Sequence, residues 1–398
     1  MNKVLVDTGA IRAHYGLGGS GIDSTGVHPE EIAVNGQKAD RHREDYEAKL
    51  LRLRAWLVQR SADGLLLTTV TNFGWLTHGR SFVSLASEGS VAKVLITADR
   101  VVLFTTTNEA PRLEREEVAG WGLELVAWPW YERFETHWQS SGFSSQSILI
   151  DRNVEAELSV LRQQLSGHEQ ELLRQLGAES AELVEQFALG VQPGRRENEL
   201  AGDLARAAWS AGMEPLVLNL ATDERAFAFR HAIPTSRVLE RYGVFSVCFR
   251  RFGLHVTLTR SVHFGPLPAD LAARHLVACT LEASVQGNSV VGAPVKTLVA
   301  AMVRDYRELG WPEEWKQHPI GGGLGFQPRE FDVTPDSQGA LFDGQGFCWN
   351  PTIAGTKSEQ TFLVTASGPV PVTAGRSFPL VTVRLGDKRF ERPAILQK

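Results

Sequence analysis

A block of helical patterns between Val154 and Ala211 most constrains the fold of this 398-residue chain, because it separates two strand-bearing parts. Gly167, Gly177 and the Pro193-Gly194 pair are expected to separate its helices. The strand patterns before the block lie at residues 64–70, 91–97, 101–105 and 147–150, after a helical pattern at 50–57. Downstream, short strands alternate with one long helical pattern from Ala269 to about Gln286. The sequence therefore predicts an α/β domain to about residue 165, followed by a second domain of strands and helices.

Residues 1–40 form a separate segment that is rich in glycine and polar residues. Such a segment buries little apolar surface, so we expect a mobile N-terminal arm. The chain as a whole is 43% hydrophobic and 22% charged, which is typical of a globular protein. Its length is sufficient for two domains with cores of their own.

Charge and hydropathy exclude several classes of partner. The net charge of −5 argues against nucleic-acid binding, which requires a basic surface. No stretch approaches the roughly 18 apolar residues of a membrane span, and the N-terminus lacks the apolar core of a signal peptide. We expect a cytoplasmic protein without nucleic-acid or membrane partners. Cys248, Cys279 and Cys348 have no Cys-x-x-Cys spacing and are odd in number, so we expect buried, reduced thiols.

Six short motifs spread along the chain carry a resemblance to a known family. In chain order they are residues 72–79, 193–200, 229–235, 253–260, 318–325 and 350–361. Together they resemble the "pita-bread" family of Xaa-Pro aminopeptidases, methionine aminopeptidases and creatinase, over roughly residues 41–375. The resemblance implies an α+β fold. It has a pita-bread C-terminal domain at 166–398, with a curved antiparallel sheet covered by helices, and a smaller α/β creatinase-type N-terminal domain at 41–165.

The family's metal site uses two aspartates, one histidine and two glutamates, and most of these are replaced here. By resemblance, the five positions fall at Ser246, Thr257, Gly322, Asn350 and Glu359. Only Glu359 is an acid, and between His231 and Ala269 the sequence has no aspartate and a single glutamate, Glu240. One carboxylate cannot hold a dinuclear centre, because each ion needs several protein ligands. We therefore predict no bound metal and no other cofactor.

His231 is the predicted catalytic residue. Creatinase, within this family, hydrolyses a C–N bond without a metal while its active-site histidine moves a proton, and His231 matches that histidine. An imidazole titrates near neutral pH and can both accept and return a proton. Arg329-Glu330 also resembles creatinase. Arg329 is expected to hold a substrate carboxylate, and Glu330 and Glu359 are expected to orient His231 or a substrate cation.

Further residues in or beside the motifs are candidates for substrate contact. They are Arg260, His255, His318, Asn350 and Arg80. Arg80 follows the N-terminal motif, and in creatinase-like dimers this domain reaches the site of the other subunit. The resemblance therefore implies a homodimer in which Arg80 contacts substrate in the second subunit.

Three functions are consistent with these residues. The first is a metal-independent hydrolase, or lyase, of an amide or amidine C–N bond in a small amino-acid-like compound. The second is a catalytically inactive protein that uses the fold to bind a ligand or partner. The third is a metal-dependent Xaa-Pro peptidase, which would need a replacement ligand set that the sequence does not provide.

Overall fold

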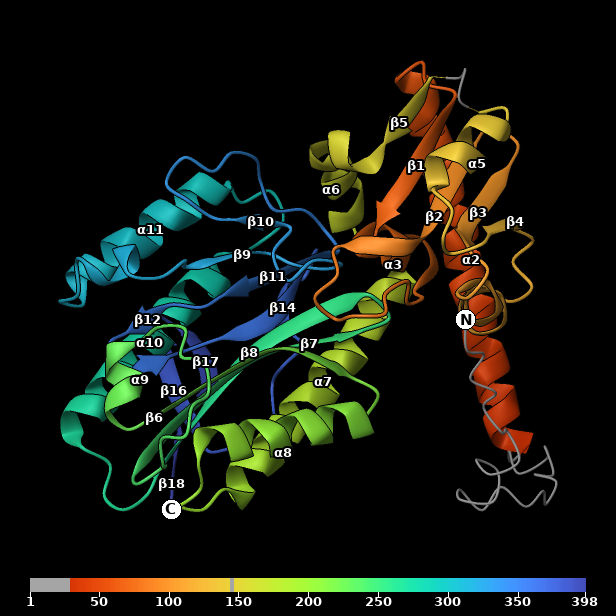
Figure 1. Ribbon diagram of the computed structural model, residues 1–398. Coiled ribbons are helices and arrows are strands. Elements are labelled where there is room, and N and C mark those ends of the chain that lie inside the picture. Colours follow the sequence, from red (N-terminus) through yellow and green to blue (C-terminus); the bar gives the residue numbers. More distant parts are fainter. Residues whose placement is uncertain (1–28, 144–146) are drawn as a thin grey trace, which may run out of the picture. The chain divides into compact units, whose positions relative to one another are not determined.

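The structure is a computed structural model that describes residues 29–143 and 147–398 (Figure 1). Within them, residues 42–398 form one unit with two main sheets. The elements of the N-terminal part are α2 (Pro29–Gln59), β1 (Gly64–Thr69), α3 (Val70–Thr77), β2 (Gly89–Thr97), β3 (Val101–Thr106), α4 (Ala110–Arg112), the π-helical turn Leu113–Glu117, β4 (Glu124–Trp128), α5 (Phe134–Ser140), β5 (Ile148–Ile150), the 3-10 turn Asp151–Asn153 and α6 (Glu155–Gln163).

The first sheet has, among the described residues, five strands in the order β4-β3-β2-β1-β5. β2 is antiparallel to β1 and β3, whereas β4 and β5 are parallel to their neighbours. Leu65 and Leu67 pack with Leu53 of α2, while Leu66 packs on the other face with Trp128 and its neighbours. Because both faces of β1 are covered, its sequence contains an unbroken run of apolar residues.

The C-terminal part contains the second sheet and its covering helices. Its elements are α7 (Gly167–Gly190), α8 (Glu197–Ser210), β6 (Glu214–Thr222), α9 (Glu224–Ala228), β7 (Tyr242–Arg251), β8 (Leu254–His263), α10 (Ala269–Gly287), α11 (Val295–Glu308), the 3-10 turn Glu314–Lys316, β9 (Gly321–Gly323), β10 (Phe331–Asp332), β11 (Gln345–Trp349), β12 (Thr352–Ile353), β13 (Thr356–Lys357), β14 (Gln360–Thr365), β15 (Gly368–Pro371), β16 (Leu380–Leu385), β17 (Lys388–Pro393) and β18 (Ile395–Gln397).

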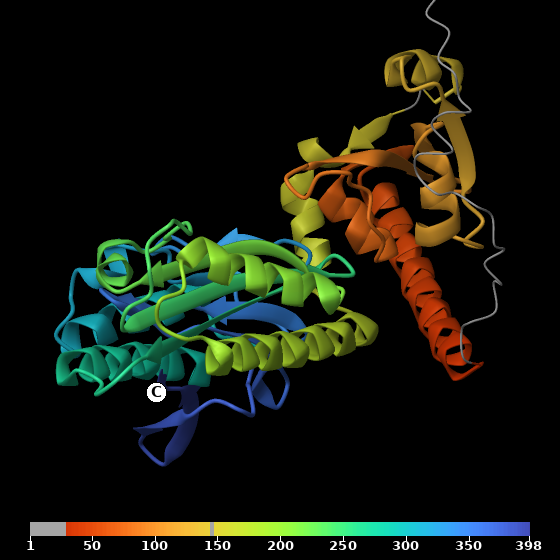
Figure 2. The same ribbon diagram turned by 60° about the horizontal axis from the view of Figure 1, so that its bottom comes forward.

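This sheet runs in the order β10-β9-β11-β14-β8-β7-β6, with β15 beside β14 and β18 beside β8. Every residue of β8 is buried, because α7 packs directly on it. α8 packs on β6, and Figures 1 and 2 both show α7 and α8 lying side by side along the sheet. The α+β class and the helix-covered sheet are confirmed. No helix in the described ranges has the length and apolarity that a membrane crossing requires.

Two expectations about segment boundaries need comment. The predicted N-terminal arm falls largely on residues 1–28, which lie outside the described residues, and α2 begins at Pro29 rather than near residue 40. Gly177 was expected to end a helix, and this is wrong, because α7 continues through it. A Cβ atom at Gly177 would lie 2.4 Å from the carbonyl oxygen of Val372. The glycine therefore permits close packing of the helix against the chain after β15.

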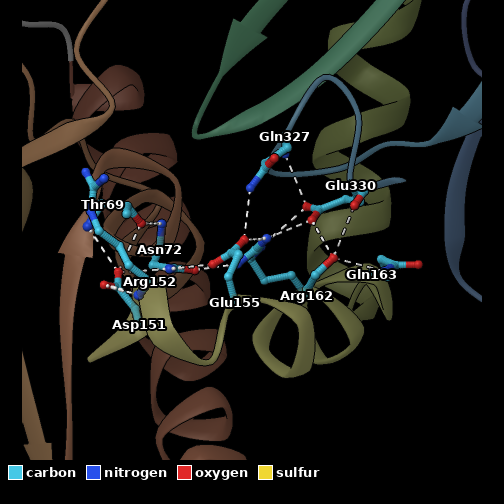
Figure 3. A network of polar contacts seen from close by, with 10 residues as sticks. Thr69, Asn72, Asp151, Arg152, Glu155, Arg162, Gln163, Gln327 and Glu330 are labelled. Carbon is cyan, nitrogen blue, oxygen red and sulfur yellow. Dashed lines mark hydrogen bonds and ion pairs between the residues drawn. The ribbon is translucent and has the colours of Figure 1, made fainter. Parts of the chain in front are cut away.

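A buried polar network joins α6 to the loop before β10 (Figure 3). The guanidinium of Arg162 lies 2.5 Å from a carboxylate oxygen of Glu155 and 2.8 Å from one of Glu330. It also donates a hydrogen bond to the Asn72 side chain at 2.6 Å. The side chains of Arg162 and Glu330 are both 0% exposed. One arginine therefore links α3, α6 and the second sheet.

We expect Arg162→Ala to lower the free energy of unfolding by about 3–5 kcal/mol, because it leaves the Glu330 carboxylate buried without its cation. Urea unfolding followed by circular dichroism measures this loss. Arg174→Ala is the matched control. Arg174 lies at the surface beside Glu171, where an ion pair contributes about 0–1 kcal/mol. Equal, small effects of both substitutions would contradict the prediction.

Candidate functional site

The positions that correspond to the family's metal ligands come together in the second sheet. Ser246 of β7 pairs with Thr259 of β8, and Cys248 pairs with Thr257. Alternate residues of a strand share a face, so these side chains point to the same side of the sheet. Asn350 and Glu359 approach from the ends of β11 and β14 and are buried. The fold therefore brings together the positions that the sequence resemblance assigns to the family's metal ligands.

Glu359 is the one carboxylate at the centre of this cluster, and polar side chains surround it. Its Oε2 atom accepts hydrogen bonds from Thr259 at 2.6 Å and from Ser246 at 3.1 Å. The Asn350 amide donates to Oε1 at 3.4 Å. Burial alone would raise the pKa of Glu359, but the Lys357 ammonium, the Thr259 hydroxyl and Arg329 lower it to about 2. The carboxylate is therefore ionised and bonded throughout the physiological pH range.

Lys357 places a positive charge at the centre of the cluster around Glu359. Its Nζ atom lies 3.1 Å from Glu359 Oε2 and 3.0 Å from Ser246 Oγ, and its side chain is 8% exposed. This lysine was not among the site residues expected from the sequence. Its signal is the spacing to Glu359, because residues two apart in an extended chain point to the same side. An ammonium thus supplies positive charge where the family places metal ions.

Gly322, which by resemblance takes the place of the family's histidine ligand, lies against neighbouring backbone that leaves no space for a side chain. β9 pairs with β10 at Gly322 and Asp332. A Cβ atom at Gly322 would lie 2.1 Å from the carbonyl oxygen of Phe331, and 3.1 Å from Cδ of Arg329. An imidazole at this position would require the strand pairing to shift. Among the described residues, no cluster of His, Cys, Asp or Glu with metal-ligand spacing includes Glu359. The donor set therefore does not fit the family's two metal ions.

His231 and His318 form a pair at the rim of this cluster. Their Nε2 atoms are 3.0 Å apart and their rings are 4.7 Å apart. His231 is exposed, whereas His318 is buried. Burial and the Lys357 charge lower the pKa of His318 to about 3, and the same causes lower the pKa of His231 against the opposing effect of Glu359. Both rings are therefore neutral at pH 7, and His231 can reach a solute.

A cavity opens beside the ion pair. Its enclosed volume is about 30 Å³, which is enough for about two water molecules. Phe229, Ala232 and Ile353 are among its apolar lining residues, and Arg230, Ser246 and Lys357 are among its polar ones. The cavity is therefore small and of mixed polarity, and neither His231 nor Arg329 is among its lining residues.

Arg329 is also turned toward the cluster. It is half-buried, its Nη1 donates to the Pro328 carbonyl at 2.8 Å, and its Nε lies 3.8 Å from Asp332. Its charge is close enough to help lower the pKa of Glu359. Two cations, Lys357 and Arg329, therefore lie in or beside the cluster, and each faces one carboxylate.

The structure does not bring four of the expected residues to this cluster. Glu330 binds Arg162 (Figure 3), and Arg260 is fully buried against Glu185, with its Nη2 2.8 Å from Oε1. The His255 ring contacts the Gly325 carbonyl at 3.1 Å, and burial lowers its pKa to about 3. Arg80 lies in the N-terminal part, 3.5 Å from Glu117. In this chain, Glu330, Arg260 and His255 have structural partners in place of a substrate. The three cysteines are buried and free, as expected.

Two family profiles match the chain. Residues 49–176 match the Creatinase/Prolidase N-terminal domain, and residues 171–366 match Metallopeptidase family M24. The two matches meet near the start of α7, close to the boundary expected from the sequence. A search of curated proteins finds no match.

Solved structures with a similar fold include a prolidase, a dipeptidase and a domain of a FACT complex subunit. The prolidase from Pyrococcus horikoshii OT3 has a TM-score of 0.68 at 16% identity, covering 83% of this chain and 99% of its own. Dipeptidase PepE from Mycobacterium ulcerans has a TM-score of 0.67 at 17% identity, covering 83% and 96%. The N-terminal domain of the FACT complex subunit SPT16 from Cicer arietinum has a TM-score of 0.61 at 11% identity, covering 84% and 96%. At these identities the likeness concerns the fold.

We expect the cluster around Glu359 to bind no manganese, because this ion prefers oxygen ligands and the site retains one carboxylate already paired with Lys357. Equilibrium dialysis against Mn²⁺ should give well below one equivalent per chain. A metal-dependent M24 peptidase treated in parallel serves as the positive control. Two equivalents in the parent protein that disappear in Glu359→Gln would contradict this expectation.

Proposed function

Because the chain belongs to the pita-bread family of creatinase and the M24 peptidases, which are hydrolases, we propose that it hydrolyses a C–N bond of a small amino-acid-like substrate without a metal ion. The observation that carries the proposal is the Lys357–Glu359 ion pair beside an exposed, neutral His231. The lysine provides a fixed positive charge, and the histidine provides a base. In metal-dependent hydrolysis, the metal ion stabilises negative charge and activates water.

His231 acts as the general base and then as the general acid. Its neutral ring accepts a proton from water, and the resulting hydroxide attacks the amide or amidine carbon. The C–N bond breaks when the imidazolium returns the proton to the leaving nitrogen. Positioned proton transfer of this kind contributes about 10²–10⁴ in rate. His318, 3.0 Å from His231, holds the ring in place.

Lys357 stabilises the negative charge that develops on the substrate. An ammonium has three N–H donors, and the described residues give Lys357 two acceptors, Ser246 and Glu359. The third donor is available to an oxygen atom in the cavity. Glu359 fixes the direction of the lysine and, with its lowered pKa, does not exchange protons itself. Arg329 binds the carboxylate of the substrate through its planar fork of donors.

A second candidate function is binding without catalysis. The observation that favours it is the full set of hydrogen bonds on Glu359, which leaves no carboxylate for the chemistry. The SPT16 domain, from a subunit of the FACT complex, has the same fold. The two functions differ in one measurable respect: a binding protein holds its ligand unchanged, whereas the proposed hydrolase releases an amine or ammonia.

We expect His231→Asn to lower turnover by about 10²–10⁴-fold while substrate affinity stays nearly constant, because the substitution removes the base and little else. A screen of amides, amidines and acyl-amino acids, followed by steady-state kinetics on the hit, measures this. His137→Asn, a histidine of the N-terminal part paired with Glu132, is the matched control. Full activity of His231→Asn, or a tightly bound ligand that is never converted, would favour the second candidate function.

The activity should also persist to unusually low pH for a histidine-dependent enzyme. The pKa of His231 is lowered by burial and by the Lys357 charge, so the ring stays unprotonated below its ordinary range near 6.5. Activity falls only as pH drops through this lowered pKa, because the protonated ring cannot accept a proton. An NMR titration of the His231 ring gives the same midpoint without a substrate. We expect Lys357→Met to raise the midpoint of the His231 titration, because the substitution removes a positive charge that lowers the pKa. An unchanged midpoint would show that the Lys357 charge does not affect the pKa of His231.

We expect Arg329→Lys to weaken binding of a carboxylate-bearing substrate by roughly ten- to hundredfold, since losing a charge-assisted contact costs about 1.5–3 kcal/mol. The lysine keeps the charge but not the two-donor geometry. Calorimetric titration with the carboxylate and with its neutral amide separates the two effects. The exposed Arg304, changed to lysine, is the control. Equal affinity of Arg329→Lys and the parent would assign Arg329 a structural role.

A further inference from the structure

Three histidines from separate segments meet beside the first turn of α7, away from the Glu359 cluster. They are His42 of α2, His78 at the end of α3 and His168 of α7. One ring nitrogen of each lies within 4.8 Å of the other two, and Nε2 of His168 is 3.0 Å from Nδ1 of His42. Nitrogen ligands at about 2.0–2.1 Å from a tetrahedral zinc ion are about 3.3 Å apart. The three rings thus lie close to ligand spacing.

His78 is held in the orientation that metal-binding histidines adopt. It is 4% exposed, and its backbone has a φ of 56°, a left-handed conformation that is uncommon outside glycine. Its Nε2 atom lies 2.8 Å from the Asp45 carboxylate. Its Nδ1 atom is buried and has no hydrogen-bond partner among the described residues. In zinc sites, a ligating histidine usually binds the metal through one ring nitrogen and donates a hydrogen bond to a carboxylate from the other.

The charges next to the cluster are compatible with a cation. The Lys49 ammonium lies 2.5 Å from Asp45 and 2.7 Å from Glu169, so two buried carboxylates face one buried lysine. The Lys49 ammonium also lies 3.3 Å from Nε2 of His78, so the two carboxylates offset its charge without removing it from the cluster. His42 and His168 are half-buried, so solvent reaches the cluster.

We propose that His42, His78 and His168 bind one divalent transition-metal ion such as zinc. Imidazole ligands suit zinc, nickel, copper and iron, whereas magnesium, calcium and manganese prefer oxygen. Three protein ligands leave the fourth tetrahedral position to a water molecule. The ion fastens α2 and the end of α3 to α7, and so ties the N-terminal sheet to the second domain. This site is independent of the proposed hydrolysis at His231.

Calorimetric titration of the metal-stripped protein with Zn²⁺ tests the proposal. We expect one equivalent to bind, and His42→Gln and His168→Gln each to lower the affinity at least about hundredfold, since loss of an outer-shell partner alone costs about 10–100-fold. The matched controls are His137→Gln, a histidine of the same N-terminal part outside the cluster, and Glu359→Gln. Both controls should bind zinc as the parent does.

Two further measurements keep the test decisive if a variant folds poorly. Zinc should raise the unfolding temperature of the parent but not of His168→Gln, because only a ligand of the native state stabilises it. X-ray absorption of the zinc-loaded parent should show three imidazole ligands and one oxygen. Absence of zinc binding in the parent, binding that survives both histidine substitutions, or binding lost in Glu359→Gln would each overturn the proposal.

Discussion

The buried ion pair between Lys357 and Glu359 is the interaction on which the site depends. Taking both charges out of water costs several kcal/mol, and this cost is offset only when the remaining donors and acceptors are satisfied. Here Ser246 contacts both members of the pair and Thr259 donates to the carboxylate. The hydroxyl groups are therefore required by the ion pair and are not simply remnants of lost aspartates.

The other substitutions follow from the same charge balance. A single ammonium compensates one carboxylate, so aspartates at positions 246 and 257 would be buried without a counter-charge. The closed backbone at Gly322 removes the space for an imidazole and admits the Arg329 side chain, which adds a second cation. The four ligand replacements that the resemblance implies are thus consistent with a site that holds Lys357 and Arg329. Restoring one family ligand alone would introduce an unpaired group without creating a metal site.

The sequence predicted the fold class and brought attention to the motif residues, because both depend on local patterns. A continuous run of buried residues marks β1, and the motif residues His231, His318 and Glu359 do come together. The partners of individual polar side chains depend on contacts distant in the sequence and could not be predicted in this way. Arg260 is matched by Glu185 on α7, and Lys357 has no counterpart in the expected ligand set. A motif therefore gave the position of a residue but not the direction of its side chain.

Arg329 and Glu330 are consecutive residues whose side chains interact with different parts of the chain. Successive residues of an extended segment point in opposite directions. Glu330 consequently turns to Arg162 of α6, while Arg329 turns toward the Glu359 cluster. The backbone N–H of Glu330 also donates to Gly323 at 2.8 Å, which fixes the segment against β9. The network around Arg162 therefore helps to set the position of Arg329, and the proposed role of Arg329 implies that weakening Arg162 affects both stability and carboxylate binding.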